Sequence, residues 1–370
     1  MYRPMIDFHQ KILSMIGILT SPTPEYPPSM TESESEIDAL TDSIRDLDVS
    51  HGTISLREMF ESIEVDPDIK ETPVPWTGPD SIAAIKIQLS TFGYCAIPDA
   101  LSSDEVDESV RLMKEWQETI PNHDRIHSAI NPHGIYKFHD AGHQEHAWFI
   151  RTRTGLRSIF EELWETKELT VSFDGSCFIP KTLSKKDKYW THSDQAPKTI
   201  GLACYQGFVA MTSNRERTFV VYPQSHLVHH QYFSSKGSGE SSKNWQLVDP
   251  NDLEGVRDRR KPLEVPSGAL VLWDSRTFHQ NQYGVPGSEE RRVQYVCYLP
   301  RNSKKNSAAM KKKRLKYFED RRTTSHWPYP LRVNGKQPQT YGDKSREIHY
   351  EDLRVPDLTR FKDDIEQLIQ

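Results

Sequence analysis

Short apolar runs, separated by turn residues, recur through the middle of the chain. They occupy residues 169–173, 176–180, 200–211, 218–222, 263–273 and 292–299. Several short strands at this spacing are typical of a β-sandwich or a β-barrel. The pattern therefore predicts that, from about residue 168 onward, the core of the protein is built mainly of β-strands.

Apolar residues recur at helical spacing in three segments that precede this region: 81–91, 103–116 and 155–166. In the second segment, the serine pair at 102–103 offers a suitable N-cap, and acidic residues fill the first turn. A turn and a short strand over 92–98 follow the first segment. The fold class that we expect is therefore mainly β with flanking helices.

Composition divides the chain into three parts. Residues 1–78 form an acidic arm that contains few aromatic residues, and we expect it to be disordered because it buries too little apolar surface. Residues 79–300 contain the predicted helices and strands and form the folded domain. Residues 301–370 form a basic extension, which we expect to pack back on the core, as the segments 326–328 and 341–342 indicate.

The charge of the chain limits its partners. A net charge of -6 over 370 residues argues against a general nucleic-acid-binding surface, so we do not expect nucleic acid as a partner. The strongly basic run 304–322 is the exception, since it could contact phosphate groups. A solvated, charged helix is the simpler interpretation of that run.

The cysteines and the apolar runs indicate the compartment. No C-x-x-C pair occurs, so we expect buried thiols in a reducing environment at the four cysteines, Cys95, Cys177, Cys204 and Cys297. No segment has the roughly 18 consecutive apolar residues of a membrane span. The short apolar run 12–20 lacks a clear cleavage site for a signal peptide. We therefore expect a cytoplasmic protein without a membrane partner, and a nuclear location stays open.

Three polar residues form a candidate metal site. His192 and Asp194 are separated by one residue, so on an extended strand both side chains project to the same side and can reach one metal ion. His279 follows the apolar strand predicted at 265–273. Two histidines and one carboxylate on one face form the facial triad of non-haem iron(II) oxygenases, which leaves coordination positions open. A bidentate 2-oxo acid and dioxygen can fill these positions.

The predicted strand after His279 opens with Arg291 and Arg292. The far carboxylate of a 2-oxo acid needs a cation, and the planar fork of arginine gives it two parallel hydrogen bonds. Strand alternation allows only one of the two arginines to face inward. A lone H-x-D pair is a weak signal, since it also describes a surface histidine beside a solvated aspartate. The ordered set of H-x-D pair, apolar strand, distal histidine and arginine strand is more specific.

Several further segments agree in order with a known family. They are Phe92–Ile97 with Leu101–Val106, Trp190–Gln195, Tyr205–Ala210, Phe219–His226 and Ser267–His279. In the fourth segment, Gln224 replaces the usual glycine of a P-G-S-H turn. Together, between about residues 80 and 300, the chain resembles the phytanoyl-CoA dioxygenase-like branch of the 2-oxoglutarate oxygenases.

The resemblance implies a fold and an activity. The fold of residues 79–300 would be a double-stranded β-helix, a cupin-like jelly roll. The activity would be that of an Fe(II)- and 2-oxoglutarate-dependent dioxygenase. Such an enzyme hydroxylates a C–H bond of a small-molecule substrate with dioxygen, and releases succinate and CO2.

The resemblance also implies roles for individual residues. The Fe(II) ligands would be His192, Asp194 and His279. Arg291 would hold the C5 carboxylate of 2-oxoglutarate, with Arg292 as the fallback. Further co-substrate contacts fall, by position, on Lys137, Gln206 and Asn281. For Lys137 and Asn281, a solvated surface position explains the residue equally well.

Other interpretations remain open at this point. The chain could be a non-catalytic ligand-binding protein on a jelly-roll fold, or a cupin-like enzyme that uses another metal. A second metal site is conceivable at the histidines 133, 139, 143 and 146. Because C-x-x-C and H-E-x-x-H spacings are absent there, a loop that lines the pocket entrance is the better interpretation. The Ser/Gly-rich loop 234–242 could cover the active site.

Overall fold

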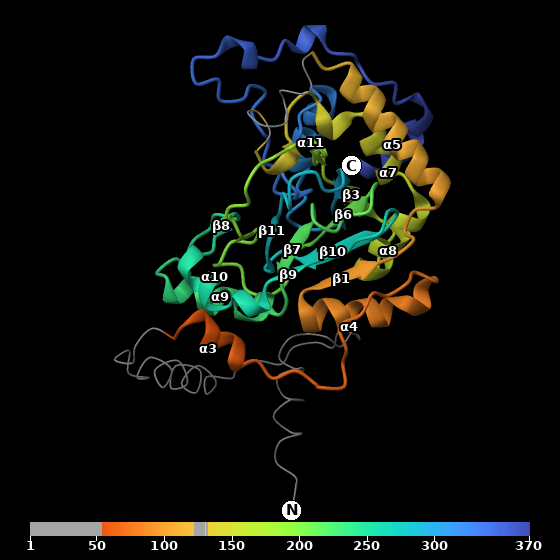
Figure 1. Cartoon of the computed structure of the whole chain (residues 1–370). Helices are drawn as coiled ribbons and strands as arrows, with labels where there is room; N and C mark the ends of the chain where they lie inside the picture. Colours follow the sequence, from red (N-terminus) through yellow and green to blue (C-terminus); the bar gives the residue numbers. More distant parts are fainter. Residues whose placement is uncertain (1–53, 122–129, 131) are drawn as a thin grey trace, which may run out of the picture. The chain divides into compact units, whose positions relative to one another are not determined.

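Two antiparallel sheets and the helices around them make up the described part of the computed structural model, residues 54–121, 130 and 132–370 (Figure 1). The larger sheet has the strand order β1 (Tyr94–Ile97), β10 (Leu270–Asp274), β6 (Tyr205–Ala210), β12 (Arg291–Val296), β4 (Ser176–Ile179) and β2 (Ile135–Tyr136). The smaller sheet has the order β8 (Gln246–Leu247), β5 (His192–Ser193), β11 (Phe278–Asn281), β7 (Phe219–Tyr222) and β9 (Lys261–Pro262). A separate ribbon pairs β13 (Tyr298–Pro300) with β3 (Leu169–Val171).

Side chains from both sheets meet in one buried cluster. Phe208 on β6 and Val293 on β12 come from the larger sheet, and Phe219 and Val221 on β7 come from the smaller one. The two sheets therefore pack face to face, as the alternating apolar runs require. Each of the six predicted apolar runs overlaps at least one strand, so the sequence pattern is confirmed for these strands.

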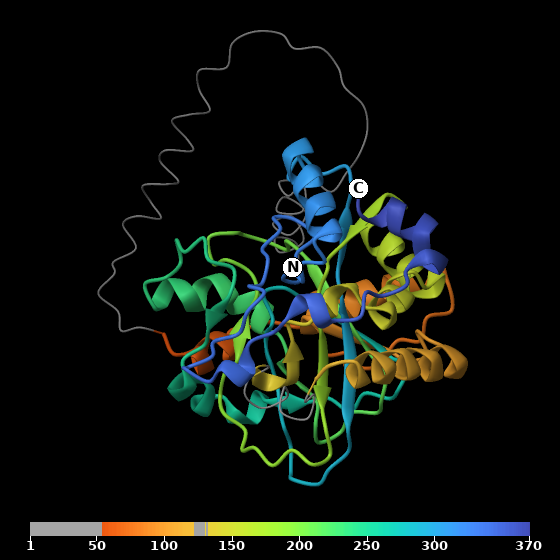
Figure 2. The same ribbon diagram turned by 90° about the horizontal axis from the view of Figure 1, so that it is seen from above.

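Helices cover the other face of the larger sheet. These are α4 (Ile82–Phe92), α5 (Ser103–Glu118), α7 (Glu145–Arg151) and α8 (Thr154–Trp164), and their apolar residues form one core with β6, β10 and β12. Ser102 caps α5, because its side chain accepts a hydrogen bond from the Glu105 amide. Figure 2 shows α5 and α8 on the same side of the molecule as the C-terminal helix α12 (Lys362–Leu368). The three predicted helices are confirmed, and the fold is mixed, with antiparallel sheets and helices.

A second group of helices packs against the smaller sheet. It consists of α3 (Leu56–Glu61), α9 (Ser225–Ser235) and α10 (Pro250–Gly255), which share a core with Tyr222 and Phe278 (Figure 1). The folded unit thus begins at Ile54, whereas the sequence placed its start at residue 79. Leu56, Met59 and Phe60 are buried in this core. Residues 1–53 of the expected acidic arm lie outside the described residues.

The C-terminal extension belongs to the same unit as the sheets. Trp327 and Tyr329 pack on Leu299 of β13. The basic run 304–322 contains α11 (Ala308–Glu319), and Arg314 in its centre is buried and donates hydrogen bonds to Asn306, Pro328 and Gln370. At least this part of the basic run is therefore structural. Within the described residues, no helix is long and apolar enough to cross a membrane.

Candidate metal centre and its pocket

The smaller sheet brings the two predicted histidine ligands together. In the antiparallel pair β5 and β11, His192 lies directly opposite His279, and their ring centroids are 4.4 Å apart. Asp194, which follows β5, places Oδ1 3.7 Å from Nε2 of His192 and Oδ2 3.3 Å from Nε2 of His279. One ligand atom from each residue lies within 4.8 Å of the others. The H-x-D pair and the distal histidine therefore converge as the sequence predicted.

A backbone carbonyl group orients each of the two histidine rings. Nδ1 of His192 lies 3.0 Å from the carbonyl oxygen of Trp190, and Nδ1 of His279 lies 2.9 Å from that of Thr277. A carbonyl oxygen only accepts, so each Nδ1 carries the proton and donates. Each ring therefore turns Nε2 toward Asp194. Burial, together with the neighbouring His279, lowers the pKa of His192 to about 3, although Asp194 acts to raise it.

The carboxylate between the histidines is buried and charged. Asp194 is 6% exposed. Burial acts to raise its pKa, but His192, His279 and His326 outweigh burial and hold the pKa below its usual value. Gln206 donates a hydrogen bond from Nε2 to Oδ2 of Asp194 at 3.2 Å. Two histidine nitrogens and a buried carboxylate thus converge, which is a set of ligands that suits a divalent cation.

A cavity of about 470 Å³ opens beside these residues. Its volume lies in the range of small-molecule sites. One wall is aromatic: Trp190 stacks between His133, with centroids 3.8 Å apart, and His192, with centroids 5.0 Å apart. Trp245, which is 39% exposed, and Tyr189 extend this wall. The opposite wall comes from the C-terminal extension and consists of Thr324, Ser325, His326, Trp327, Arg332 and Asn334.

The four predicted co-substrate residues lie around this cavity at different depths. Lys137 lines it, and desolvation lowers the pKa of Lys137 while the Asp194 carboxylate raises it. Gln206 contacts Asp194, and its Oε1 has no hydrogen-bond partner within the described residues. Asn281 donates to the hydroxyl of Tyr295 at 2.9 Å, and Tyr295 lines the cavity. Lys137 thus reaches the cavity directly, whereas Gln206 and Asn281 act through residues that line it.

The two arginines of β12 face opposite sides of the larger sheet. Arg291 points between the sheets, where Nε donates to Asn214 at 2.9 Å and Nη1 donates to Cys177 at 3.2 Å. Its Nη2 is buried without a hydrogen-bond partner in the described part of the chain. Arg292 points to the helices, where it contacts Gln117 and pairs with Glu290 at 2.6 Å. Arg291 does not line the cavity but lies behind Tyr295, on whose hydroxyl its charge acts.

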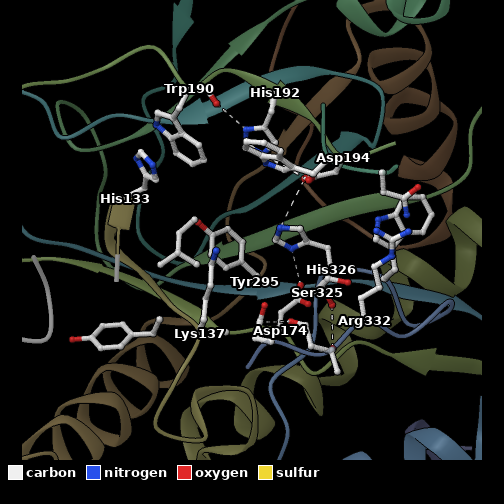
Figure 3. Close-up of a pocket in the computed structure, with 18 of the residues that line it drawn as sticks. His133, Lys137, Asp174, Trp190, His192, Asp194, Tyr295, Ser325, His326 and Arg332 are labelled. Carbon is white, nitrogen blue, oxygen red and sulfur yellow. Dashed lines mark hydrogen bonds and ion pairs between the residues drawn. The ribbon is translucent and has the colours of Figure 1, made fainter. Parts of the chain in front are cut away.

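Sequence reasoning missed one histidine of the site. Nδ1 of His326 lies 3.0 Å from Oδ2 of Asp174, and its Nε2 lies 3.8 Å from Oδ2 of Asp194 (Figure 3). Burial acts to lower the pKa of His326, but Asp174 and Asp194 raise it to about 9. His326 and Asp174 are 152 residues apart, so no local spacing could connect them. The only signal was the His-Trp-Pro motif, which indicated an ordered tail.

The histidines of residues 133–146 and the loop 234–242 are the other predicted features near the active site. His143 and His146 are buried and bond to the Arg322 carbonyl and the Ser176 hydroxyl, whereas His133 lines the cavity. Among the residues described, only the cluster of His192, Asp194 and His279 qualifies as a candidate metal site. The described structure thus offers no second metal site at residues 133–146. Beside the loop 234–242, Asn244 and Trp245 line the cavity, while the loop itself does not.

The fold and the cluster define a protein with an antiparallel two-sheet core that carries a buried His-Asp-His centre. No family model matches the chain. The chain is 27% identical over 291 residues to Ava biosynthesis cluster protein O of Aspergillus versicolor. The matched region covers 73% of this chain and 91% of that protein. The structure is similar to GlcNAc Inducible Gene 2 (DUF1479) of Candida albicans, with a TM-score of 0.50, 12% identity and coverage of 76% and 74%. That similarity shows a shared fold.

Weaker structural similarities include proteins crystallised with a metal ion. HygX of Streptomyces hygroscopicus, solved with nickel and 2-oxoglutarate, matches with a TM-score of 0.43 and 12% identity, over 59% of this chain and 86% of that chain. The epimerase SnoN, solved with Fe3+, alpha ketoglutarate and nogalamycin RO, matches with a TM-score of 0.41 and 16% identity, over 60% and 84%.

Proposed function

We propose that the protein is an Fe(II)- and 2-oxoglutarate-dependent oxygenase built on a double-stranded β-helix. The strand orders support this fold, because β10-β6-β12-β4 in one sheet face β5-β11-β7-β9 in the other. From β4 to β12, successive strands along the chain alternate between the two sheets except at β8 and β9. A jelly roll distributes its eight strands between two sheets in this manner.

The arrangement of the three ligands carries the proposal. His192 and His279 present Nε2 to Asp194 from paired strands, and the backbone carbonyls of Trp190 and Thr277 hold both rings in that tautomer. Metal-binding histidines characteristically donate their other N–H to such an acceptor. Two histidines and one carboxylate that leave positions open are typical of non-haem Fe(II) oxygenases.

The residues around the ligands have complementary tasks. Bound Fe(II) and 2-oxoglutarate would supply the oxidant for a substrate C–H bond, with consumption of dioxygen and release of succinate and CO2. Arg291 would offer Nη2, which has no hydrogen-bond partner among the described residues, to the C5 carboxylate. Tyr295, which lines the cavity and accepts from Asn281, connects Arg291 with the cavity. Lys137 adds positive charge at the cavity wall, which favours a dianionic co-substrate. Gln206 holds Asp194 in place.

The cavity indicates a small organic substrate that has an apolar surface. Trp190, Trp245 and Leu247 form the wall next to the metal ligands, and Trp245 and Leu247 are exposed there. Exposed aromatic and aliphatic side chains that rim a pocket are typical of ligand-binding sites. The similarity to a protein of a fungal biosynthesis cluster supports a role in small-molecule biosynthesis.

Anaerobic titration tests this function without knowledge of the substrate. We expect the full-length protein to bind one equivalent of Fe(II), and to bind 2-oxoglutarate only when the metal is present. The absorption band of the iron–2-oxoglutarate complex reports the second event. On exposure to dioxygen, slow formation of succinate should follow. His192→Ala should remove both the band and the succinate, because it deletes one of three ligands.

Two results would contradict the proposal. Equal binding of 2-oxoglutarate in the absence of metal would indicate a non-catalytic binding protein. Tight binding of Zn(II) or Mn(II), with no band and no succinate in the presence of Fe(II), would indicate a cupin-like enzyme that uses another metal. His349→Ala is the matched control, since His349 is an exposed histidine that pairs with Glu351 in the C-terminal extension.

A further inference from the structure

The C-terminal extension places a fourth histidine at the candidate metal centre. His326 lies between two buried carboxylates, with Nδ1 3.0 Å from Asp174 and Nε2 3.8 Å from Asp194 (Figure 3). The Tyr295 ring packs edge-on against the His326 ring, with centroids 5.4 Å apart. A carboxylate that accepts from Nδ1 fixes the orientation of a histidine ring. Its Nε2 is therefore directed at the metal ligand Asp194.

Backbone contacts fix both members of this pair. The Thr324 amide donates to the Phe173 carbonyl at 2.9 Å, and the Phe173 amide donates to the Thr324 hydroxyl at 3.0 Å. These bonds set the register of two segments that are far apart in the chain. Asp174 follows Phe173 directly and is 1% exposed, while His326 lies two residues after Thr324. The pair is thus built into the fold rather than formed by two mobile side chains.

His326 lies outside the set of metal ligands. The ligand atoms of His192, Asp194 and His279 are within 4.8 Å of one another, and His326 does not complete a group of this kind. It approaches only Oδ2 of Asp194, the oxygen that also accepts from Gln206. At 3.8 Å the contact is too long for a direct hydrogen bond, so it acts through charge or through one bridging water molecule.

A carboxylate ligand has two oxygens, and its rotation decides which oxygen meets the metal. In other metal sites, residues that bond to the ligands hold them in orientation, and their loss weakens metal binding about 10- to 100-fold. Gln206 acts on Asp194 from the larger sheet, and His326 acts on the same oxygen from the cavity side.

We propose that His326, oriented by Asp174, is a positioning residue that fixes the rotation of the Asp194 carboxylate at the metal. This role rests on the proposed metal function. It makes the C-terminal extension part of the metal centre, although all three ligands come from the smaller sheet or directly follow it.

Anaerobic Co(II) titration of the full chain tests this role, because the spectrum of bound Co(II) reports the ligand geometry. The test variants are His326→Phe and His326→Leu, which remove the donor with little change in bulk. Each should weaken Co(II) binding about 10- to 100-fold and alter the Co(II) spectrum. His326→Gln keeps a donor and should recover part of the affinity. Asp174→Asn should weaken binding less than His326→Phe, since an amide oxygen still accepts from Nδ1.

The controls separate the possible failures. His349→Ala should bind Co(II) as the wild type does, and the melting temperatures of the metal-free variants identify any variant that does not fold. Wild-type affinity and spectrum in whichever of His326→Phe and His326→Leu folds would overturn the positioning role. So would a His326→Gln variant as weak as His326→Phe. Failure of the wild type itself to bind Co(II) or Fe(II) would instead overturn the proposed function.

Discussion

The two walls of the cavity are built in different ways. The wall at the smaller sheet carries His192 and His279, and each ring is oriented by the carbonyl of the residue two positions earlier in the chain. The C-terminal wall carries His326, which is oriented by a carboxylate 152 residues away. The first wall follows from local strand geometry, whereas the second depends on tertiary packing. Its contribution is therefore visible only in the folded chain.

The largest expected effect lies in the first wall. His279→Ala deletes a ligand, so the affinity for Co(II) or Fe(II) should fall by more than about 100-fold, beyond the range for residues that only support a ligand. His326→Phe in the second wall should cost less. Competition with a metal chelator measures both. His230→Ala, at an exposed histidine of α9, is the control and should retain the wild-type affinity. If the losses at His279 and His326 were equal, the distinction between the walls would not hold.

The same contrast explains what the sequence could predict. The H-x-D pair and the strand before His279 are local patterns, and the structure brings these residues together. The strands and the three helices also follow from local periodicity. The start of the folded unit at Ile54 does not, because α3 is too short for a periodic signal and is buried by tertiary contacts, among them those with α9 and α10. His326 is missed for the same reason.

Strand alternation allowed only one of Arg291 and Arg292 to hold 2-oxoglutarate, and binding measurements can test which one does. Arg291→Gln should weaken 2-oxoglutarate binding to the metal-loaded protein about 10- to 100-fold, because hydrogen bonds to charged groups contribute about 1.5–3 kcal/mol. Arg291→Lys should recover part of this loss, since it keeps the charge without the fork. Arg292→Gln should leave 2-oxoglutarate binding unchanged and lower the melting temperature, because Arg292 contacts Glu290, Gln117 and the Phe178 ring.

Anaerobic titration of 2-oxoglutarate and thermal unfolding measure the two effects separately. A loss of co-substrate affinity in Arg292→Gln with none in Arg291→Gln would reverse the assignment. The inward-facing Arg291 would then have a packing role, since its guanidinium lies 5.4 Å from the centroid of the Phe208 ring.

The smallest expected effect compares a buried histidine that contacts the C-terminal wall with one that contacts the larger sheet. His143 bonds to the Arg322 carbonyl of the C-terminal extension at 3.0 Å, and His146 bonds to Ser176 of β4 at 2.8 Å. Both side chains are fully buried, and burial lowers the pKa of each to about 3. At neutral pH both rings are therefore neutral in the folded protein.

Acidification should consequently destabilise the fold. Below the ordinary histidine pKa of about 6.5, the unfolded chain binds protons that the folded chain excludes until about pH 3. The free energy of unfolding should fall as the pH falls through this window. Each histidine contributes about 2 kcal/mol between pH 7 and pH 5. Urea unfolding of the metal-free protein at these two pH values measures the loss, and His143→Gln and His146→Gln should each reduce it.

The two variants then show whether support from the C-terminal extension matters to the metal centre. In His143→Gln, the free energy of unfolding should depend less on pH, and the difference from the wild type is the contribution of the His143 side chain. Co(II) binding should also weaken if the contact of His143 with the C-terminal extension supports the wall that carries His326. In His146→Gln, the pH dependence should fall by the same amount, while Co(II) binding stays at the wild-type level, because Ser176 bonds to Gln294 of β12 and not to a metal ligand. An unchanged pH dependence in both variants would mean that neither ring is held neutral. Equal weakening of Co(II) binding in both would mean that the effect of His143→Gln does not come from its contact with the C-terminal wall.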